Sequence, residues 1–148
     1  MFAIDYPLDW GDDVYCPFWS GTVTFAGRNT AHINYGIFVV IQDDGGEYVN
    51  MSGHLSELPD WVVPGAAVTH EDVIGYAGDT GDPGGTIPVV PPHLHSAFYR
   101  NPSFLDDGSP FGGQGLQVTN HHYVGTAACT GPGVYQVGRD SQGNAISN

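Results

Sequence analysis

The chain has 148 residues, which fits one domain, and it carries 16 acidic residues against three arginines and no lysine, for a formal net charge of −13. This balance argues against binding to nucleic acid or to an anionic membrane surface, since both partners are held by Lys and Arg. No run reaches the ~18 consecutive apolar residues of a membrane helix, and no secretion signal opens the chain.

Short apolar or alternating runs separated by turn residues predict an all-β domain, a composition that 22 Gly and 11 Pro support. The predicted strands cover residues 2–6, 14–16, 21–25, 33–41, 47–51, 73–78 and 93–99. The run from Ile33 to Ile41 is the strongest of them, and Asp43 to Gly46 predicts a hairpin turn into the next strand. Residues 79–92 form a long loop rich in Gly and Pro, and no helical period of useful length is present.

The signal weakens beyond Asn101, and the last residues have the composition of a frayed tail. We therefore expect a working domain over 1–125 and a Gly-rich tail of unknown role over 126–148. Cys16 and Cys129 make one disulfide or remain two thiols, and their spacing does not decide between these states.

His93 and His95 are the residues that most directly suggest chemistry. They are two apart in a predicted strand, so their side chains share one face with Cα atoms ~6.6 Å apart, while Leu94 faces the core. Two imidazoles at that spacing reach one site, where one can bind a metal and the other can act beside it. The alternative interpretation is an exposed histidine pair without function.

Asp5 and His54 are weaker candidates when each is taken alone. Asp5 lies within a predicted strand, where a carboxylate needs a partner such as a metal, a backbone cap or Arg28. His54 follows a predicted strand, a position that ordinary surface histidines often take. His32, His70, His121 and His122 have no pattern around them and are interpreted as surface residues, although the last two form a pair that can bind metal opportunistically.

These pieces occur in an order that resembles the lysostaphin-type zinc metallopeptidases, the glycyl-glycine endopeptidases that cut peptidoglycan cross-links. The blocks are Ile4-Asp5-Tyr6, Gly21-Thr22-Val23, Tyr48 to Leu55, Val73 to Gly81 and Pro92-His93-Leu94-His95. The resemblance covers about residues 1–100 and is most specific from Val73 to His95. It implies an antiparallel β-sheet domain with a narrow active-site groove walled by loops, 79–92 being one wall.

The resemblance also implies roles for single residues. Asp5 matches the aspartate of a His-x-x-x-Asp motif and His95 the second histidine of His-x-His, both ligands of Zn²⁺. His54 and His93 match the two histidines that do not bind zinc and that flank the attacking water. The substrate so implied is a peptidoglycan peptide, and the place of action is extracellular or periplasmic. No oligomeric state is predicted.

One position departs from the family pattern, because Met1 stands where the histidine of His-x-x-x-Asp is expected. Catalytic zinc usually has three protein ligands. Three explanations are open: the start is misassigned or truncated, the domain is a degenerate member that has lost catalysis, or another group such as His32 or water completes the shell. We favour truncation, because His54, His93 and His95 are retained together.

The leading hypothesis is therefore a zinc-dependent endopeptidase that hydrolyses peptidoglycan cross-links. The alternative is a catalytically degenerate module that binds peptidoglycan or regulates an amidase. A third interpretation, an unrelated β-domain with incidental histidines, would not explain the order of the five blocks.

Overall fold

A computed structural model describes residues 3–81, 91–117, 133–134, 138–139 and 145–147 of the chain. It confirms the expected all-β fold, and no α-helix occurs in the described part. The described helical segment is one 3₁₀ turn, η1 (Ile33–Tyr35), so none of the described residues form a helix long and apolar enough to cross a membrane.

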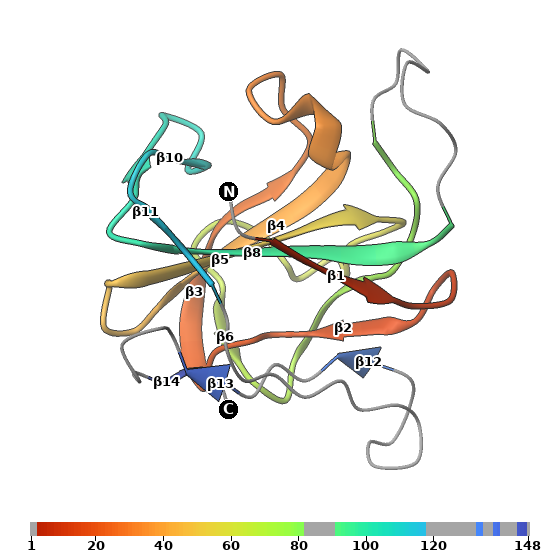
Figure 1. Cartoon of the computed structure of the whole chain (residues 1–148), viewed down its shortest axis with the longest axis horizontal. Helices are drawn as coiled ribbons and strands as arrows, with labels where there is room; N and C mark the ends of the chain where they lie inside the picture. Colours follow the sequence, from red (N-terminus) through yellow and green to blue (C-terminus); the bar gives the residue numbers. More distant parts are fainter. Residues whose placement is uncertain (1–2, 82–90, 118–132, 135–137, 140–144, 148) are drawn as a thin grey trace.

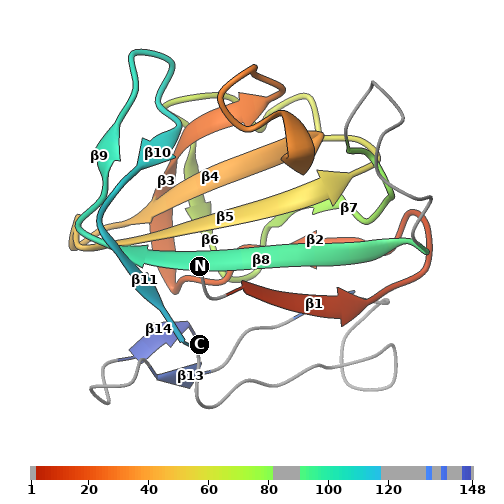
Figure 2. The ribbon, with the colours of Figure 1, turned by 45° about the horizontal axis from the view of Figure 1, so that its top comes forward.

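A seven-stranded antiparallel sheet crosses the middle of the molecule (Figure 1). Its strands follow the order β1-β8-β5-β4-β3-β6, and β11 pairs with the other half of the β8 edge that β1 occupies. The strands are β1 (Ala3–Pro7), β3 (Ser20–Gly27), β4 (Ile37–Asp43), β5 (Tyr48–Leu55), β6 (Ala67–Thr69), β8 (His93–Arg100) and β11 (Gln114–Leu116). In Figure 2 the strands β1, β8, β5 and β4 lie side by side in this order.

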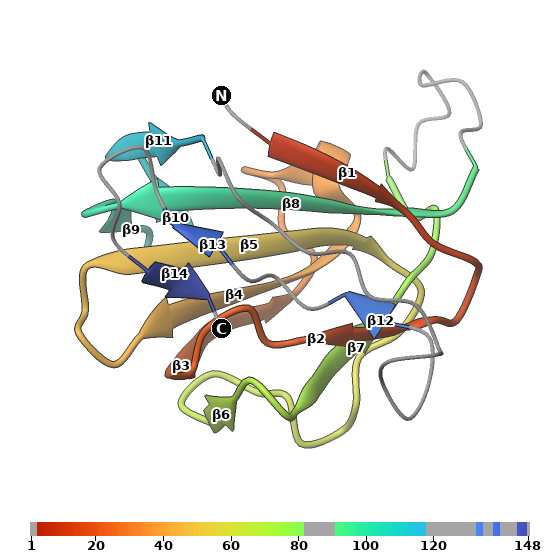
Figure 3. The same ribbon diagram turned by 60° about the horizontal axis from the view of Figure 1, so that its bottom comes forward.

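Smaller sheets accompany this one. Strand β2 pairs with β7, as Figure 3 shows, and β12 joins β2 in the parallel direction. Two hairpin-like pairs complete the described fold, β9 with β10 and β13 with β14. The bounds are β2 (Asp13–Tyr15), β7 (Val73–Tyr76), β9 (Ser103–Phe104), β10 (Pro110–Phe111), β12 (Gly133–Val134), β13 (Gly138–Arg139) and β14 (Ala145–Ser147).

The main core fills the space between the large sheet and the β2–β7 pair. Leu94 and Phe98 from β8 are fully buried there with Val14 from β2 and Ile74 from β7. Burying a Leu, Val or Phe side chain contributes ~1.5–3 kcal/mol, so this face of β8 holds the strand in register. The expectation that Leu94 faces the core is confirmed.

A second apolar cluster lies on the opposite face of the large sheet. Its buried members are Phe25, Phe38, Val40, Val49 and Met51. Tyr35 from η1 and Phe104 from β9 pack against them, so the 28–36 loop and the β9–β10 pair cover this face. His93 and His95 alternate with the core residues of β8 and therefore project on this second face.

The predicted strand from Ile33 to Ile41 is wrong in its first part. Residues Ile33–Tyr35 form the 3₁₀ turn, and β4 begins only at Ile37. Gly36 between them has a φ of 65°, which breaks an extended run, and a Cβ there would lie 2.4 Å from the Thr80 carbonyl. Close approach to Thr80 thus overrides the apolar pattern.

Other differences concern the ends of strands. Strand β1 runs through Pro7, which an edge strand tolerates because no ladder partner needs the missing N–H. Strand β5 continues past the predicted end at Met51 and includes His54. The short strands β6, β9, β10 and β11 were not predicted.

The domain boundary predicted at residue 125 lies outside the described residues, as does Cys129. Two residues of the predicted tail, Gly133 and Val134, pair with Asp13 and Val14 of β2. Cys16 is buried, and its thiol donates a hydrogen bond to the Phe18 carbonyl oxygen at 3.4 Å. Burial raises the pKa of this thiol to about 12.

Candidate active site

Asp5 and His95 lie opposite one another on the paired strands β1 and β8. The Nδ1 atom of His95 is 2.8 Å from Oδ1 of Asp5. Because a carboxylate oxygen accepts, Nδ1 carries the hydrogen in this state. The His95 side chain is 23% exposed and that of Asp5 63%, so solvent reaches the pair. The structure thus brings together the two residues that the family resemblance implies as ligands.

His54 reaches the same place from β5, the other neighbour of β8. Gly53 pairs with His95, and the pairing of β5 with β4 shifts by one residue at this point. His54 has a φ of 62°, in the left-handed region that few residues other than glycine adopt. This bulge turns the imidazole toward the other histidines, with ring centroids 4.8 Å from His93 and 5.5 Å from His95.

Backbone carbonyls at the two ends of the 79–92 segment orient the other two imidazoles. Nδ1 of His54 donates to the Thr80 oxygen at 2.7 Å, and Nδ1 of His93 donates to the Pro91 oxygen at 2.9 Å. A carbonyl oxygen only accepts, so the hydrogen of each neutral ring sits on Nδ1 and Nε2 is left as an acceptor. Residues 82–90, most of the predicted loop wall, lie outside the described residues.

The surroundings of His54 favour its neutral form. Burial lowers the pKa of His54, and the nearby His93 and His95 lower it further. The hydrogen bond to Thr80 and the charge of Asp5 oppose this effect only in part. A neutral imidazole is the form that accepts a proton.

Tyr35 is a site residue that the sequence analysis missed. Its ring meets His95 edge-on at 5.1 Å between centroids and lies nearly parallel to His54 at 6.4 Å. Gly53 makes room for it, since a Cβ there would lie 2.7 Å from Tyr35 Cδ1. Burial raises the pKa of Tyr35, so the phenol stays protonated. The sequence predicts a strand at this position, and that prediction gives no indication that the Tyr35 ring packs on the histidines.

Thr80 is the second residue missed. Its hydroxyl accepts from the Ile37 amide at 3.0 Å and donates to the Leu55 carbonyl oxygen at 2.5 Å, while its own carbonyl oxygen accepts from His54. Thr80 therefore ties β4, the end of β5 and His54 together. The sequence suggests a Thr-Gly turn at Thr80, but a turn signal does not reveal which residues Thr80 contacts.

The remaining histidines lie elsewhere. Nε2 of His32 hydrogen bonds the Pro110 carbonyl oxygen at 2.9 Å, and the His70 ring stacks on Trp19. His121 and His122 lie outside the described residues. His32 does not form a group of three metal-binding side chains with Asp5 and His95 among the described residues, so the structure gives no support to the explanation that it completes the shell.

A carboxylate oxygen and an imidazole nitrogen are two of the donors that zinc prefers. The described part of the chain contains no group of three His, Cys, Asp or Glu side chains that could hold a metal ion. Asp5 and His95 thus fit two of the usual three protein ligands, and Met1, at the position of the third, lies outside the described residues.

Three histidines and an aspartate from the neighbouring strands β1, β8 and β5 thus meet at one place, with the aspartate opposite the second histidine of His-x-His. The sequence matches peptidase family M23 over residues 2–107. The chain belongs to this family. A comparison with curated proteins gives no significant match.

Solved structures give the same result for the fold. A structure of LytU is 27% identical, with a TM-score of 0.57, 75% of this chain covered and 68% of the other. The catalytic domain of lysostaphin from Staphylococcus simulans, described as an antimicrobial peptidase, is 24% identical, with a TM-score of 0.59 and coverages of 75% and 74%. A zinc-containing peptidase from Vibrio cholerae is 24% identical, with a TM-score of 0.53 and coverages of 72% and 27%.

Proposed function

We propose that the chain is a zinc-dependent metalloendopeptidase that hydrolyses peptide cross-links of peptidoglycan. The observation that carries the proposal is the convergence of Asp5, His54, His93 and His95 from three neighbouring strands onto one end of the sheet. Membership of a peptidase family supports it, and so does the likeness to an antimicrobial peptidase and to a zinc-containing one.

Asp5 and His95 are the residues that would hold the metal. Their facing atoms, Oδ1 and Nδ1, share one hydrogen, and this hydrogen must leave before both atoms can act as ligands. A bound zinc ion would supply Lewis acidity, which lowers the pKa of water to ~7 and polarises the scissile carbonyl.

His93 is the proposed general base. Its Nε2 is an acceptor because Nδ1 is engaged with Pro91, so it can take a proton from the water that attacks the peptide carbonyl. The same proton can then pass to the amine that leaves. The bond to Pro91 keeps a hydrogen on Nδ1 throughout, so the transferred proton would enter and leave at Nε2.

His54 is the proposed second group at the water. In its neutral form Nε2 accepts a hydrogen bond and holds the water in place. If His54 takes the proton of that water in place of His93, the same atom then donates to the oxygen on which negative charge develops. Tyr35, packed against both His54 and His95, fixes the distance between the two parts of the site.

Peptidoglycan as substrate places the proposed action outside the cytoplasmic membrane, in an extracellular or periplasmic setting. The net charge of −13 opposes approach to an anionic wall, and this repulsion weakens as salt rises. We therefore expect faster wall cleavage at physiological than at low ionic strength.

The test is to load the purified chain with Zn²⁺, measure zinc per chain by elemental analysis, and follow cleavage of a cross-linked muropeptide and of pentaglycine. Cleavage that a zinc chelator abolishes and added Zn²⁺ restores supports the proposal. Zinc bound in equal amount to the chain, with neither substrate cut, contradicts it.

One observation favours a second function. Only two of the usual three ligands meet among the described residues, which fits a degenerate family member that binds peptidoglycan or regulates an amidase. Such a module would sediment with purified peptidoglycan equally well with and without Zn²⁺ and would cut neither substrate.

A further inference from the structure

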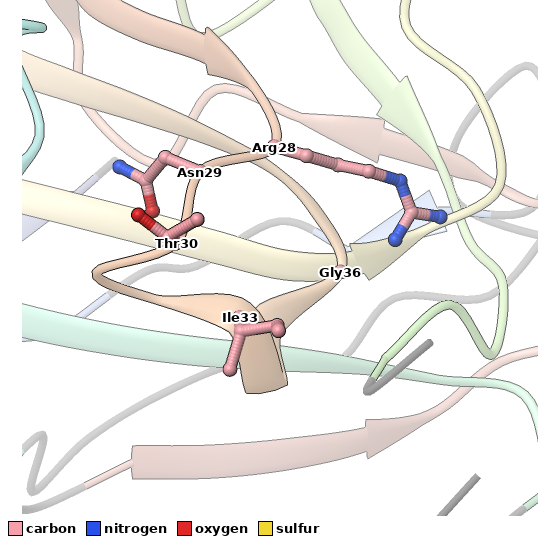
Figure 4. Close-up of a pocket in the computed structure, with 5 residues that line it drawn as sticks. All are labelled: Arg28, Asn29, Thr30, Ile33 and Gly36. Carbon is pink, nitrogen blue, oxygen red and sulfur yellow. The ribbon is translucent and has the colours of Figure 1, made fainter. Parts of the chain in front are cut away.

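A pocket beside the candidate active site contains the one arginine that the described structure leaves unpaired. The pocket has a volume of about 270 Å³ and is lined by Arg28, Asn29, Thr30, Ile33 and Gly36 (Figure 4). All five belong to the segment between β3 and β4 that covers the second face of the sheet. Figure 4 shows the Arg28 side chain pointing away from those of Asn29 and Thr30.

Arg28 differs from the other arginine whose side chain is described. Arg100 is paired with Glu47 through Nε and Oε1. Arg28 has no hydrogen bond or ion pair to any described residue, although the chain carries 16 acidic residues. A guanidinium left without a carboxylate in so acidic a protein is available to an anion from outside.

The pocket is held in shape from two sides. Asn29 donates to Asp107 at 2.8 Å and to Ser109 at 3.0 Å, and its Oδ1 accepts from the His32 amide at 2.8 Å. Nε2 of His32 is bound to Pro110. The side chain of Asn29 is therefore engaged with its own loop and with the segment between β9 and β10, and Arg28 is the charged residue among the five that line the pocket.

The other side of the pocket adjoins the site. Gly36, which lines the pocket, lies so close to Thr80 that a Cβ would come within 2.4 Å of its carbonyl. That same carbonyl oxygen orients His54. Tyr35, the residue before Gly36, packs on His54 and His95. The wall of the pocket is therefore connected through Tyr35 and Gly36 to the residues that surround the histidines.

We propose that the Arg28 pocket is a subsite that binds a carboxylate of the peptide substrate. The proposal rests on the proposed peptidase function and adds the requirement that the substrate carries a free carboxylate. An Arg guanidinium matches a carboxylate through two parallel N–H···O bonds, and Ile33 offers an apolar wall for the side chain that bears it. In a chain of charge −13 such a local cation also offsets the general repulsion of an acidic peptide.

The experiment measures binding, so it does not depend on catalysis. The probes are a cross-linked muropeptide with free carboxylates and the same molecule with its carboxylates amidated, titrated into the full chain by calorimetry or NMR. We expect the wild-type chain to prefer the free carboxylate by roughly tenfold. Arg28→Gln should remove the preference, Arg28→Lys should keep a part of it, and added salt should reduce it.

Arg100→Gln is the matched control, because it removes the same charge at a distance from the pocket and should leave the preference intact. Equal affinity of the two probes for the wild-type chain overturns the proposal, as does a preference that survives Arg28→Gln or disappears in Arg100→Gln. Thermal unfolding of each variant shows that it is folded.

Cleavage of the same probes separates the two proposals. A carboxylate preference that depends on Arg28, with neither probe cut, leaves the subsite standing and removes the peptidase function. Cleavage at equal efficiency in the wild-type chain and in Arg28→Gln, without any preference, leaves the peptidase function standing and removes the subsite.

Discussion

Two regions of the candidate site hold their histidines in different ways. On the β1–β8 strand pair, His95 and Asp5 face each other, and Nδ1 of His95 donates a hydrogen bond to the Asp5 carboxylate. At the ends of the 79–92 segment, His54 and His93 are instead bound to the carbonyl oxygens of Thr80 and Pro91.

The difference shows how each region could act. A metal between His95 and Asp5 would replace the hydrogen that they share, because both facing atoms are zinc donors. His54 and His93 keep a hydrogen on Nδ1 and present Nε2, an atom that can accept a proton or bind a metal. The proposal that His54 and His93 act on the water therefore rests on the family resemblance and needs the zinc measurements below.

The largest expected effect comes from breaking the first region. His95→Ala removes one of the two proposed ligands, so zinc per chain should fall to background and hydrolysis should be lost with it. Elemental analysis and muropeptide cleavage measure the two losses on the same sample. A variant that keeps its zinc would show that the metal is held elsewhere.

A substitution in the second region should affect hydrolysis but not zinc content. His93→Ala deletes the proposed general base, so hydrolysis should fall by ~10²–10⁴ while zinc per chain stays nearly unchanged. His95→Ala, prepared in parallel, is the control. If His93→Ala loses zinc as fully as His95→Ala, both histidines are ligands or their roles are reversed.

Each region was predictable from the sequence only in part. Alternation along His93 to Tyr99 predicts that His93 and His95 share a face. The pairing that brings Asp5 to His95 is not visible in the sequence pattern, and only the family resemblance suggested that Asp5 belongs to the site. Nothing in the local pattern discloses that His54 adopts a left-handed conformation, because that depends on the space beside β8. Family resemblance, and not spacing, placed His54 in the site.

The positions of Tyr35 and Thr80 were beyond the sequence for a related reason. The apolar run from Ile33 to Ile41 favours a strand throughout, but Gly36 interrupts it at a contact with Thr80. That contact joins segments more than forty residues apart, and a single-sequence pattern carries no information about it.

A smaller effect is expected from completing the ligand set in the first region. Met1→His places an imidazole four residues before Asp5, and we expect zinc affinity to rise by roughly tenfold or more, since a third protein ligand displaces water. Competition with a chromogenic zinc chelator measures both chains. Equal affinities would mean that another residue already fills the position.

The contact between the two regions can be altered through Gly53. A Cβ in Gly53→Ala would lie 2.7 Å from Tyr35 Cδ1, so the ring must move away from His54 and His95, at a cost of ~1–3 kcal/mol in the free energy of unfolding. Gly81→Ala is the matched control near the same histidine. Its Cβ would meet nothing closer than 3.7 Å, so it should change stability by less than ~0.5 kcal/mol. Urea denaturation of both variants measures the difference, and equal losses would show that the Gly53 contact is not special.

The smallest expected effect concerns the left-handed backbone conformation of His54 in the second region. His54→Gly and His54→Ala both delete the imidazole, so their difference reports the cost of the φ of 62° together with the greater freedom of Gly in the unfolded chain. A left-handed conformation costs an Ala ~1–2 kcal/mol, whereas Gly loses ~0.5–1 kcal/mol through its freer unfolded chain. The Gly variant should therefore be the more stable by roughly 0.5–1 kcal/mol.

At Thr22, an exposed position of β3 without a positive φ, the order should reverse and Ala should be the more stable. Denaturation in metal-free buffer measures all four variants without a contribution from zinc binding. If Ala is the more stable at both positions, His54 is not strained, and the bulge alone does not explain how its ring reaches His93.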